Sequence, residues 1–195
     1  MQNTLISQQH DGRLIVRYRP VLACIPGHGL VNFLTFSIYN NTAMNTINTR
    51  IATLDDLEIT ATLFDAYRQF YEQTPDLPLA TEFIRNRIQN NESVIILASN
   101  DNQHVIGFCQ LYPTFCSVEA KPIYSLYDLF VVPEARRSGA GKILLQEAER
   151  LAAENGMARM DLTTAKTNKP AQAAYEKLGW IRDDVFYAYS KHIEI

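Results

Sequence analysis

The stretch of sequence that decides the fold is VVPEARRSGAGK, residues 131–142, followed at once by the helical run Ile143–Glu149. An apolar strand ends at Pro133, the chain turns through a basic segment spaced by glycines, and a helix begins. This geometry points several backbone N–H groups and the positive end of the helix dipole at one spot. The segment therefore predicts a binding site for a pyrophosphate.

Two kinds of residue would shape this site. Gly139 and Gly141 carry no side chain that would keep an anion away from the backbone donors, and Arg136, Arg137 and Lys142 add positive charge around it. Glycines in such a turn also serve helix packing alone, so this segment by itself leaves both explanations open. It matches neither the Gly-x-Gly-x-x-Gly fingerprint nor the P-loop pattern.

A second segment, NKPAQAAYEKLGW at residues 168–180, favours the first explanation. Together the two segments resemble the GNAT superfamily of N-acetyltransferases. That family has Arg/Gln-x-x-Gly-x-Gly/Ala after a strand, which Arg136, Gly139 and Gly141 match. Further along it has Asn-x-x-Ala-x-x-x-Tyr-x-x-x-Gly-Phe, matched by Asn168, Ala171, Tyr175, Gly179 and, in place of phenylalanine, Trp180.

Length and composition agree with one such domain. A chain of 195 residues with 47% hydrophobic and 20% charged residues can bury a core and fits a single α/β unit. The net charge of -3 gives no footprint for nucleic acid. Three cysteines form no disulfide framework and suit a reducing compartment, so we expect a cytoplasmic protein. The histidines and cysteines lack metal-ligand spacing, and we expect no metal.

The first 46 residues differ from the rest. Basic residues precede an apolar stretch over 21–39, as in a signal sequence, but Pro26, Gly27, Gly29 and Asn32 interrupt it. We therefore favour an N-terminal extension of undefined order, residues 1–46, over a targeting signal. The resemblance covers residues 47–195, which we predict to be the N-acetyltransferase domain.

Within that domain, apolar runs of two periodicities alternate. They predict a GNAT-type mixed central sheet flanked by helices, in one α/β domain. Strands are expected over 47–52, 93–99, 104–112, 124–132, 157–163 and 184–192. Helices are expected from Asp55 or Asp56 to Tyr71, around 80–88, from 143 to the Asn155-Gly156 stop, and over 170–178.

The resemblance implies acetyl-CoA as co-substrate, with its pantetheine arm along the strand before the glycines. It assigns cofactor binding to Leu129, Phe130, Val131, Arg136, Arg137, Ser138, Gly139, Ala140, Gly141, Lys142, Asn168 and Ala171. An ordinary central strand would carry the same side chains at 129–131. By itself, Asn168 is also typical of a helix cap just before Pro170.

Two residues are candidates for catalysis. Tyr175 has the spacing of a core-facing tyrosine, but the resemblance implies that its phenol donates a proton to the coenzyme A sulfur; a phenol with pKa ~10 is protonated at neutral pH. Polyamine acetyltransferases of the superfamily carry Leu-Glu-Asp where this chain has Leu126-Tyr127-Asp128. Because that glutamate is absent, Asp128 is our candidate general base, directly or through a water chain. A buried structural aspartate is the alternative.

The resemblance implies a primary amine as acceptor. Candidate walls of its site are Tyr71, Glu72, Asp76, Tyr112, Phe115, Phe186, Tyr187 and Tyr189. Aromatic rings and carboxylates suit a small cationic metabolite or, as an alternative, a protein lysine; they equally suit plain packing. A non-catalytic acyl-CoA-binding sensor is the hypothesis from another class. The prediction includes no nucleic acid or membrane partner and allows a homodimer.

Overall fold

The computed structural model describes residues 6–10, 13–17 and 46–194 and divides the chain into two units. In the first unit, β1 (Ile6–His10) pairs antiparallel with β2 (Arg13–Arg17). Most of the predicted extension lies outside the described residues, and the boundary at residue 47 stays a prediction. Among the described residues, no helix is both long and apolar enough to cross a membrane.

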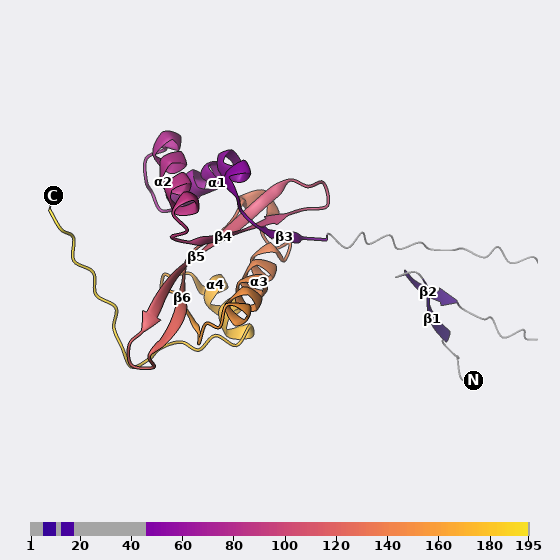
Figure 1. Ribbon diagram of the computed structural model, residues 1–195. Helices are drawn as coiled ribbons and strands as arrows, with labels where there is room; N and C mark the ends of the chain where they lie inside the picture. Colours follow the sequence, from indigo (N-terminus) through magenta and orange to yellow (C-terminus); the bar gives the residue numbers. More distant parts are fainter. Residues whose placement is uncertain (1–5, 11–12, 18–45, 195) are drawn as a thin grey trace, which may run out of the picture. The chain divides into compact units, whose positions relative to one another are not determined.

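The second unit is built on a five-stranded sheet (Figure 1). In spatial order its strands are β3 (Asn48–Ile51), β4 (Val94–Ser99), β5 (Val105–Cys116), β6 (Lys121–Val131) and β7 (Met160–Asp161). The first four pair antiparallel, and β7 pairs parallel with β6. The predicted mixed sheet is confirmed.

Helices cover both faces of this sheet (Figure 1). On one face lie α1 (Leu57–Phe70) and α2 (Leu77–Gln89), and on the other lie α3 (Ala140–Glu154) and α4 (Lys169–Lys177). The fold class predicted from the sequence, a sheet flanked by helices in an α/β domain, is therefore correct.

Successive side chains of the strands point to opposite faces of the sheet and so form two hydrophobic cores. In β4, Ile95 and Leu97 pack under α1 and α2, whereas Ile96 and Ala98 pack under α3. All four are at most 2% exposed. Because burying an isoleucine or leucine side chain contributes roughly 1.5–3 kcal/mol, these contacts stabilise the sheet from both sides.

Local sequence signals set where the helices begin. Thr53 and Asp56 form a capping box around a short 3-10 turn, from which α1 continues. Asp76 accepts a hydrogen bond from Leu79 N–H at the start of α2, and Asn168 accepts one from Ala171 N–H at the start of α4. Gly139 precedes α3 with φ 96°, a left-handed conformation that glycine adopts without strain.

Two predicted strands are wrong in extent. Only Met160 and Asp161 form a strand within 157–163, because β6 pairs with them through Tyr124 and Ser125 and then diverges. Residues 184–192 form no strand; every residue over 181–194 is exposed. Apolar alternation gives a segment strand propensity, but a strand also needs a partner for its backbone, and here the segment leaves the sheet (Figure 1).

Candidate active site

The divergence of β6 from β7 opens a cleft of about 400 Å³. One side is the second half of β6 with the end of α1; the other is the segment 162–164 with α4. Its lining residues are Tyr67, Phe70, Tyr71, Leu126, Tyr127, Leu129, Phe130, Val131, Arg136, Gly141, Leu162, Thr163, Thr164, Asn168, Pro170, Ala171 and Tyr175. The two sequence segments that carried the resemblance thus meet at one cavity.

At one end of the cleft lies the glycine turn, by which we mean residues 136–142. The first hydrogen bond within α3 runs from Ile143 N–H to Gly139 C=O at 3.0 Å, so the N–H groups before it have no partner within the helix. Both Arg137, with φ 63°, and Gly139 are left-handed. Left-handed residues beside a helix N-terminus are typical of anion-binding backbone.

The space around the glycines tests whether the turn fits a pyrophosphate. A Cβ placed on Gly139 would meet nothing within 4 Å, and one on Gly141 would touch only Val131 Cγ2, at 4.0 Å. The turn is therefore open on its outer side, and either Cβ would occupy space that an anion needs to reach the backbone. The residues present fit the phosphate part of a nucleotide cofactor.

The structure brings together most of the cofactor-binding candidates. Those that line the cleft are Leu129, Phe130, Val131, Arg136, Gly141, Asn168 and Ala171. Exposed Arg137, Ser138, Gly139 and Lys142 lie in the adjoining glycine turn, whereas Ala140 is buried beneath it. Arg136 donates a hydrogen bond to the Val131 carbonyl at 3.3 Å and stacks its guanidinium 5.4 Å from the centre of the Phe70 ring.

Tyr175 of α4 lies on the side of the cleft that α4 and the segment 162–164 form; we call this the open side. Its ring packs 6.0 Å from that of Trp180, and it lines the cavity as well as contacting the core. The core contact expected from its spacing is therefore present, and its role as proton donor stays a prediction. Burial, and secondarily the nearby Tyr71, raises the pKa of the Tyr175 hydroxyl above its usual value of 10.0. The hydroxyl keeps its proton at neutral pH and can donate it.

Asp128 lies behind the cleft wall, only 4% exposed, and does not line the cavity itself. Burial raises its pKa from 3.8 to about 6, which a hydrogen bond with Tyr67 opposes in part. Tyr67 does line the cavity, and its hydroxyl also approaches the Tyr127 carbonyl at 3.4 Å. Tyr67 is thus the group between the cleft and the buried carboxyl.

Aromatic side chains dominate the cleft beside Asp128. The Tyr67 ring lies 5.1 Å from that of Tyr71 and 6.2 Å from that of Phe130, and Tyr112 meets Tyr127 edge to face at 5.9 Å. These ring faces surround the place where Tyr67 meets the cavity, and Asp128 is the buried acidic group behind them.

Few of the predicted acceptor-site walls are at the cleft. Tyr71 lines the cleft, and Tyr112 contacts Tyr127, which also lines it. Asp76 instead caps α2. The remaining candidates, Glu72, Phe115, Phe186, Tyr187 and Tyr189, are exposed and do not line the cavity. For the last three this follows from the missing strand.

Sequence reasoning missed Tyr67, Phe70 and Tyr127 as cleft residues. Tyr67 has the helical spacing of a core-facing residue, and only its hydroxyl indicates another role, because a buried tyrosine usually needs a hydrogen-bond partner. Tyr127 lies where β5 and β6 shift register, between Leu126 and Asp128. That irregularity has no signature in the sequence.

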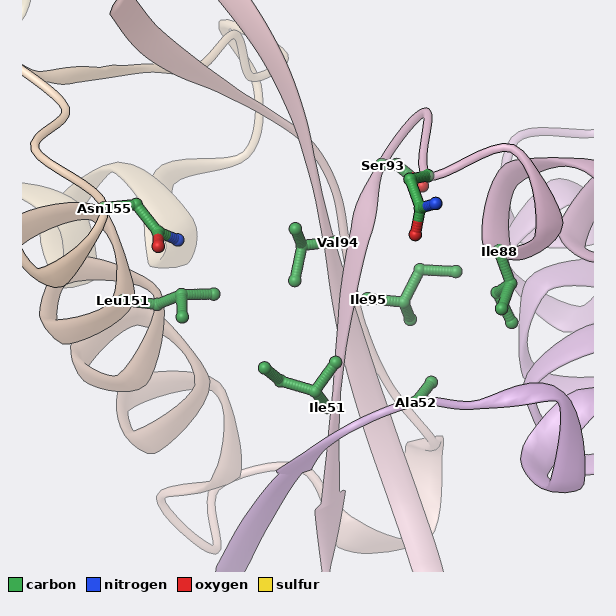
Figure 2. Close-up of a pocket in the computed structure, with 9 residues that line it drawn as sticks. Ile51, Ala52, Ile88, Ser93, Val94, Ile95, Leu151 and Asn155 are labelled. Carbon is green, nitrogen blue, oxygen red and sulfur yellow. The ribbon is translucent and has the colours of Figure 1, made fainter.

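A second cavity, of about 260 Å³, lies at the edge of the sheet where β3 ends (Figure 2). Figure 2 shows Leu151 of α3 and Asn155, which follows α3, on one side of β4, and Ile88 of α2 with Ile95 on the other. Ser93, at the start of β4, lines it too. Its mostly apolar lining carries no candidate catalytic group.

Comparison with known proteins gives consistent matches. The model of the acetyltransferase (GNAT) family matches residues 59–180. A curated relative, the uncharacterized N-acetyltransferase YhfO of Bacillus subtilis (strain 168), is 45% identical over 147 residues, 75% of this chain and 98% of its own length. An aminoglycoside N(6')-acetyltransferase type 1 of Acinetobacter genomosp. 13 is 27% identical over 109 residues, 54% of this chain and 75% of its own.

Solved structures agree with the sequence matches. The crystal structure of a probable acetyltransferase superposes with a TM-score of 0.71 at 38% identity, covering 76% of this chain and 99% of that one. The region of similarity therefore includes the glycine turn, α4 and the cleft between them.

Proposed function

The chain belongs to the GNAT family of acetyltransferases, and on that premise we propose that it transfers the acetyl group of acetyl-CoA to a primary amine of a small cationic molecule. One observation carries the proposal: a single cleft adjoins the glycine turn, the Tyr175 hydroxyl and, through Tyr67, the Asp128 carboxyl. The similarity to N-acetyltransferases decides against a non-catalytic sensor.

In this proposal the glycine turn holds the pyrophosphate. Gly139 and Gly141 leave the backbone donors accessible, and the side chains of Arg136, Arg137 and Lys142 balance the negative charge. The edge of β6 over 129–131, which β7 leaves unpaired, offers backbone groups to the pantetheine arm. Acetyl-CoA supplies a thioester that is already activated for transfer.

Asp128 acts as the general base in this mechanism. An amine is protonated at neutral pH and must lose a proton before it can attack. Tyr67 lines the cleft and its hydroxyl hydrogen-bonds with Asp128, so it passes the proton inward: it gives its own proton to the carboxylate and takes one from the substrate. A base with a pKa of about 6 is ionised at neutral pH yet accepts a proton more readily than an exposed aspartate.

Tyr175 holds a proton on the other side of the cleft. Its raised pKa keeps the phenol neutral, so that it can donate to the departing sulfur. The acid and the base thus come from different elements, α4 and β6, and the pKa of Asp128 is shifted toward the working pH, as its role as a base requires.

The aromatic rings and the buried charge support this substrate class. Tyr67, Tyr71 and Phe70 present aromatic surfaces to the cavity, and ring faces attract ammonium groups. The buried Asp128 adds negative charge behind them when it is ionised. The relative from Acinetobacter, an aminoglycoside acetyltransferase by name, supports an amine-bearing small molecule.

Turnover with a panel of acceptors tests the proposal. The full chain would be given acetyl-CoA with a polyamine, an aminoglycoside or a lysine peptide, and both thiol release and the acetylated product would be measured. We expect amine-dependent release of thiol, with the small polycations ahead of the peptide. No acetylated product from any amine would contradict the proposed function, and a preference for the peptide would correct the substrate class.

A further inference from the structure

Gln110 of β5 is fully buried, and only half of its amide is paired. Its Nε2 donates a hydrogen bond to Ser93 Oγ at 2.7 Å. Its Oε1 is the one buried side-chain polar atom without a partner among the described residues. Buried polar atoms in folded proteins nearly always have a partner, so this acceptor calls for an explanation.

Strand register places Gln110 between Ser93 and Asp128. On β6 the residue directly opposite Gln110 is Asp128, and on β4 it is Ile95. Opposite residues of antiparallel strands share a face, with Cβ atoms about 4.5–5.5 Å apart. Ser93 lies two residues before Ile95, hence on the same face, and Figure 2 shows it at the edge of the second cavity. Ser93 just before β4, Gln110 of β5 and Asp128 of β6 thus form a polar row on one face of the sheet.

The two flanking strands decide which amide atom faces Asp128. Strands β4 and β6 lie on opposite sides of β5. Since the Gln110 Nε2 is engaged toward β4, Oε1 is the atom that remains for the side of β6. A carboxylate has no proton to offer this acceptor, whereas a carboxylic acid has one. The missing partner would therefore exist only when Asp128 is protonated.

We propose that Gln110 is a positioning residue for Asp128: its Oε1 accepts a hydrogen bond from the Asp128 carboxylic acid, and Ser93 keeps the amide in that orientation. The inference rests on the proposed function, because there Asp128 gains its proton from the substrate amine. The ammonium nitrogen gives its proton to the Tyr67 oxygen while Tyr67 gives its own proton to a carboxylate oxygen, and the acid so formed donates to Gln110. Asp128 releases one proton to solvent, through Tyr67, before the next turnover.

Burial moves the pKa values of the tyrosine and cysteine side chains nearest to Asp128 upward, away from its range. The titratable groups that face or influence Asp128 are Tyr67 from α1, Cys109 and Tyr112 from β5, Tyr127 from β6 and, around Tyr112, the ion-paired Arg87 and Glu92. Burial raises the pKa of Tyr112 to about 12 and raises those of Tyr67 and Cys109 further. A titration near pH 6 at this site would thus belong to Asp128.

Carboxyl NMR of the full chain, labelled with ¹³C at the aspartate side chains, tests the inference directly. The Asp128 signal is the one that Asp128→Asn removes. In Gln110→Met the acid loses its acceptor, and in Ser93→Ala the amide is free to turn its N–H groups toward the carboxylate. We expect the pKa of Asp128 to fall by about one pH unit in each variant, the worth of one hydrogen bond.

Two matched controls separate this effect from general damage. Ser93→Thr keeps the hydroxyl, and Ser99→Ala removes a buried serine from the far end of the same strand. Both should leave the pKa of Asp128 unchanged. If Gln110→Met fails to fold, the Ser93 variants decide alone, since Ser93 is only partly buried. An Asp128 pKa that is equal in wild type and Ser93→Ala overturns the inference.

This readout does not depend on turnover. Absence of acetyl transfer by the wild type would contradict the proposed function whatever the NMR titration gives. An Asp128 pKa that is unchanged in the variants of an active enzyme would instead show only that Gln110 does not position Asp128. The two failures are therefore distinguishable.

Discussion

The two sides of the cleft differ in how firmly they are held. On the side of α1 and β6, Phe130 and Asp128 are at most 6% exposed, and the rings of Tyr67, Phe108 and Phe130 pack against one another. On the other side, α4 has no buried residue, and the segment 162–164 follows a two-residue strand. The proposed base, Asp128, is thus fixed before substrate arrives, whereas the proposed acid, Tyr175, lies on a side with few buried contacts that cofactor binding can adjust.

The largest expected effect on activity comes from Asp128, on the side of α1 and β6. Asp128→Asn keeps the shape of the side chain and removes the base, so kcat/KM should fall on the order of 10²–10⁴-fold at neutral pH. Steady-state acetyl transfer with a good amine acceptor measures it. Asp55→Asn, at an exposed acid in the turn before α1, is the control and should match wild type. Wild-type rates in Asp128→Asn would return Asp128 to a structural role.

A smaller loss is expected on the open side. Tyr175→Phe keeps the ring that packs on Trp180 and removes only the hydroxyl, and we expect kcat to fall about 10²-fold, the lower end for positioned proton transfer. Solvent reaches this side and can protonate the sulfur in its place. Calorimetry should show unchanged affinity for acetyl-CoA. Equal kcat in mutant and wild type would leave Tyr175 as a packing residue.

Burial of Asp128 should also cost stability, in a pH-dependent way. Its pKa of about 6 in the folded chain, against 3.8, means that folding disfavours the ionised form by about 3 kcal/mol. At pH values below both, the carboxyl is neutral in both states and the cost is absent; it grows as pH rises and is complete above about 6.

Asp128→Asn should therefore raise the free energy of unfolding by up to about 3 kcal/mol at pH 8 and by little at pH 4. Urea denaturation at the two pH values measures the difference. The same change would lower activity and raise stability, a combination expected for a functional group held in an unfavourable place. An equal gain at both pH values would mean that the pKa of Asp128 is the same in the folded and the unfolded chain.

The smallest effect separates the two glycines of the turn. Gly139→Ala puts a Cβ on a left-handed residue and should cost roughly 1 kcal/mol of stability, whereas Gly141→Ala lies in the first turn of α3 and should cost none. Both variants should bind acetyl-CoA more weakly, because a Cβ fills space that the pyrophosphate uses. Urea denaturation and calorimetry would check the pair. Unchanged affinity in folded Gly141→Ala would remove the glycine turn from the cofactor site.

Local signals explain how much the sequence could predict. The glycine turn and the Asn168–Trp180 segment are each contiguous, and turn chemistry, caps and helical spacing fix their conformation from neighbours along the chain. The mixed sheet followed from the alternation of periods. Tyr67, Gln110 and Asp128 come from three separate elements, and only strand register and helix packing bring them together.

The predicted strand over 184–192 is wrong because its formation also depends on parts of the chain that are far away in the sequence. Val185, Phe186, Tyr187 and Tyr189 have strand propensity, but whether a strand forms depends on an edge with free backbone groups in reach. The sequence predicted the propensity and could not predict the geometry of the edge. The acceptor-site walls predicted in this segment depended on that strand, and without the strand they do not line the cavity.

The pH dependence of kcat/KM tests most directly that a buried Asp128 is the base of an acetyl-transfer site. We predict that kcat/KM of the wild type rises with pH through about 6, because the carboxyl must be ionised to accept a proton. In Asp128→Asn this rise should disappear, leaving only the ionisation of the amine substrate at higher pH. A rise through the same pH that persists in Asp128→Asn would contradict the account.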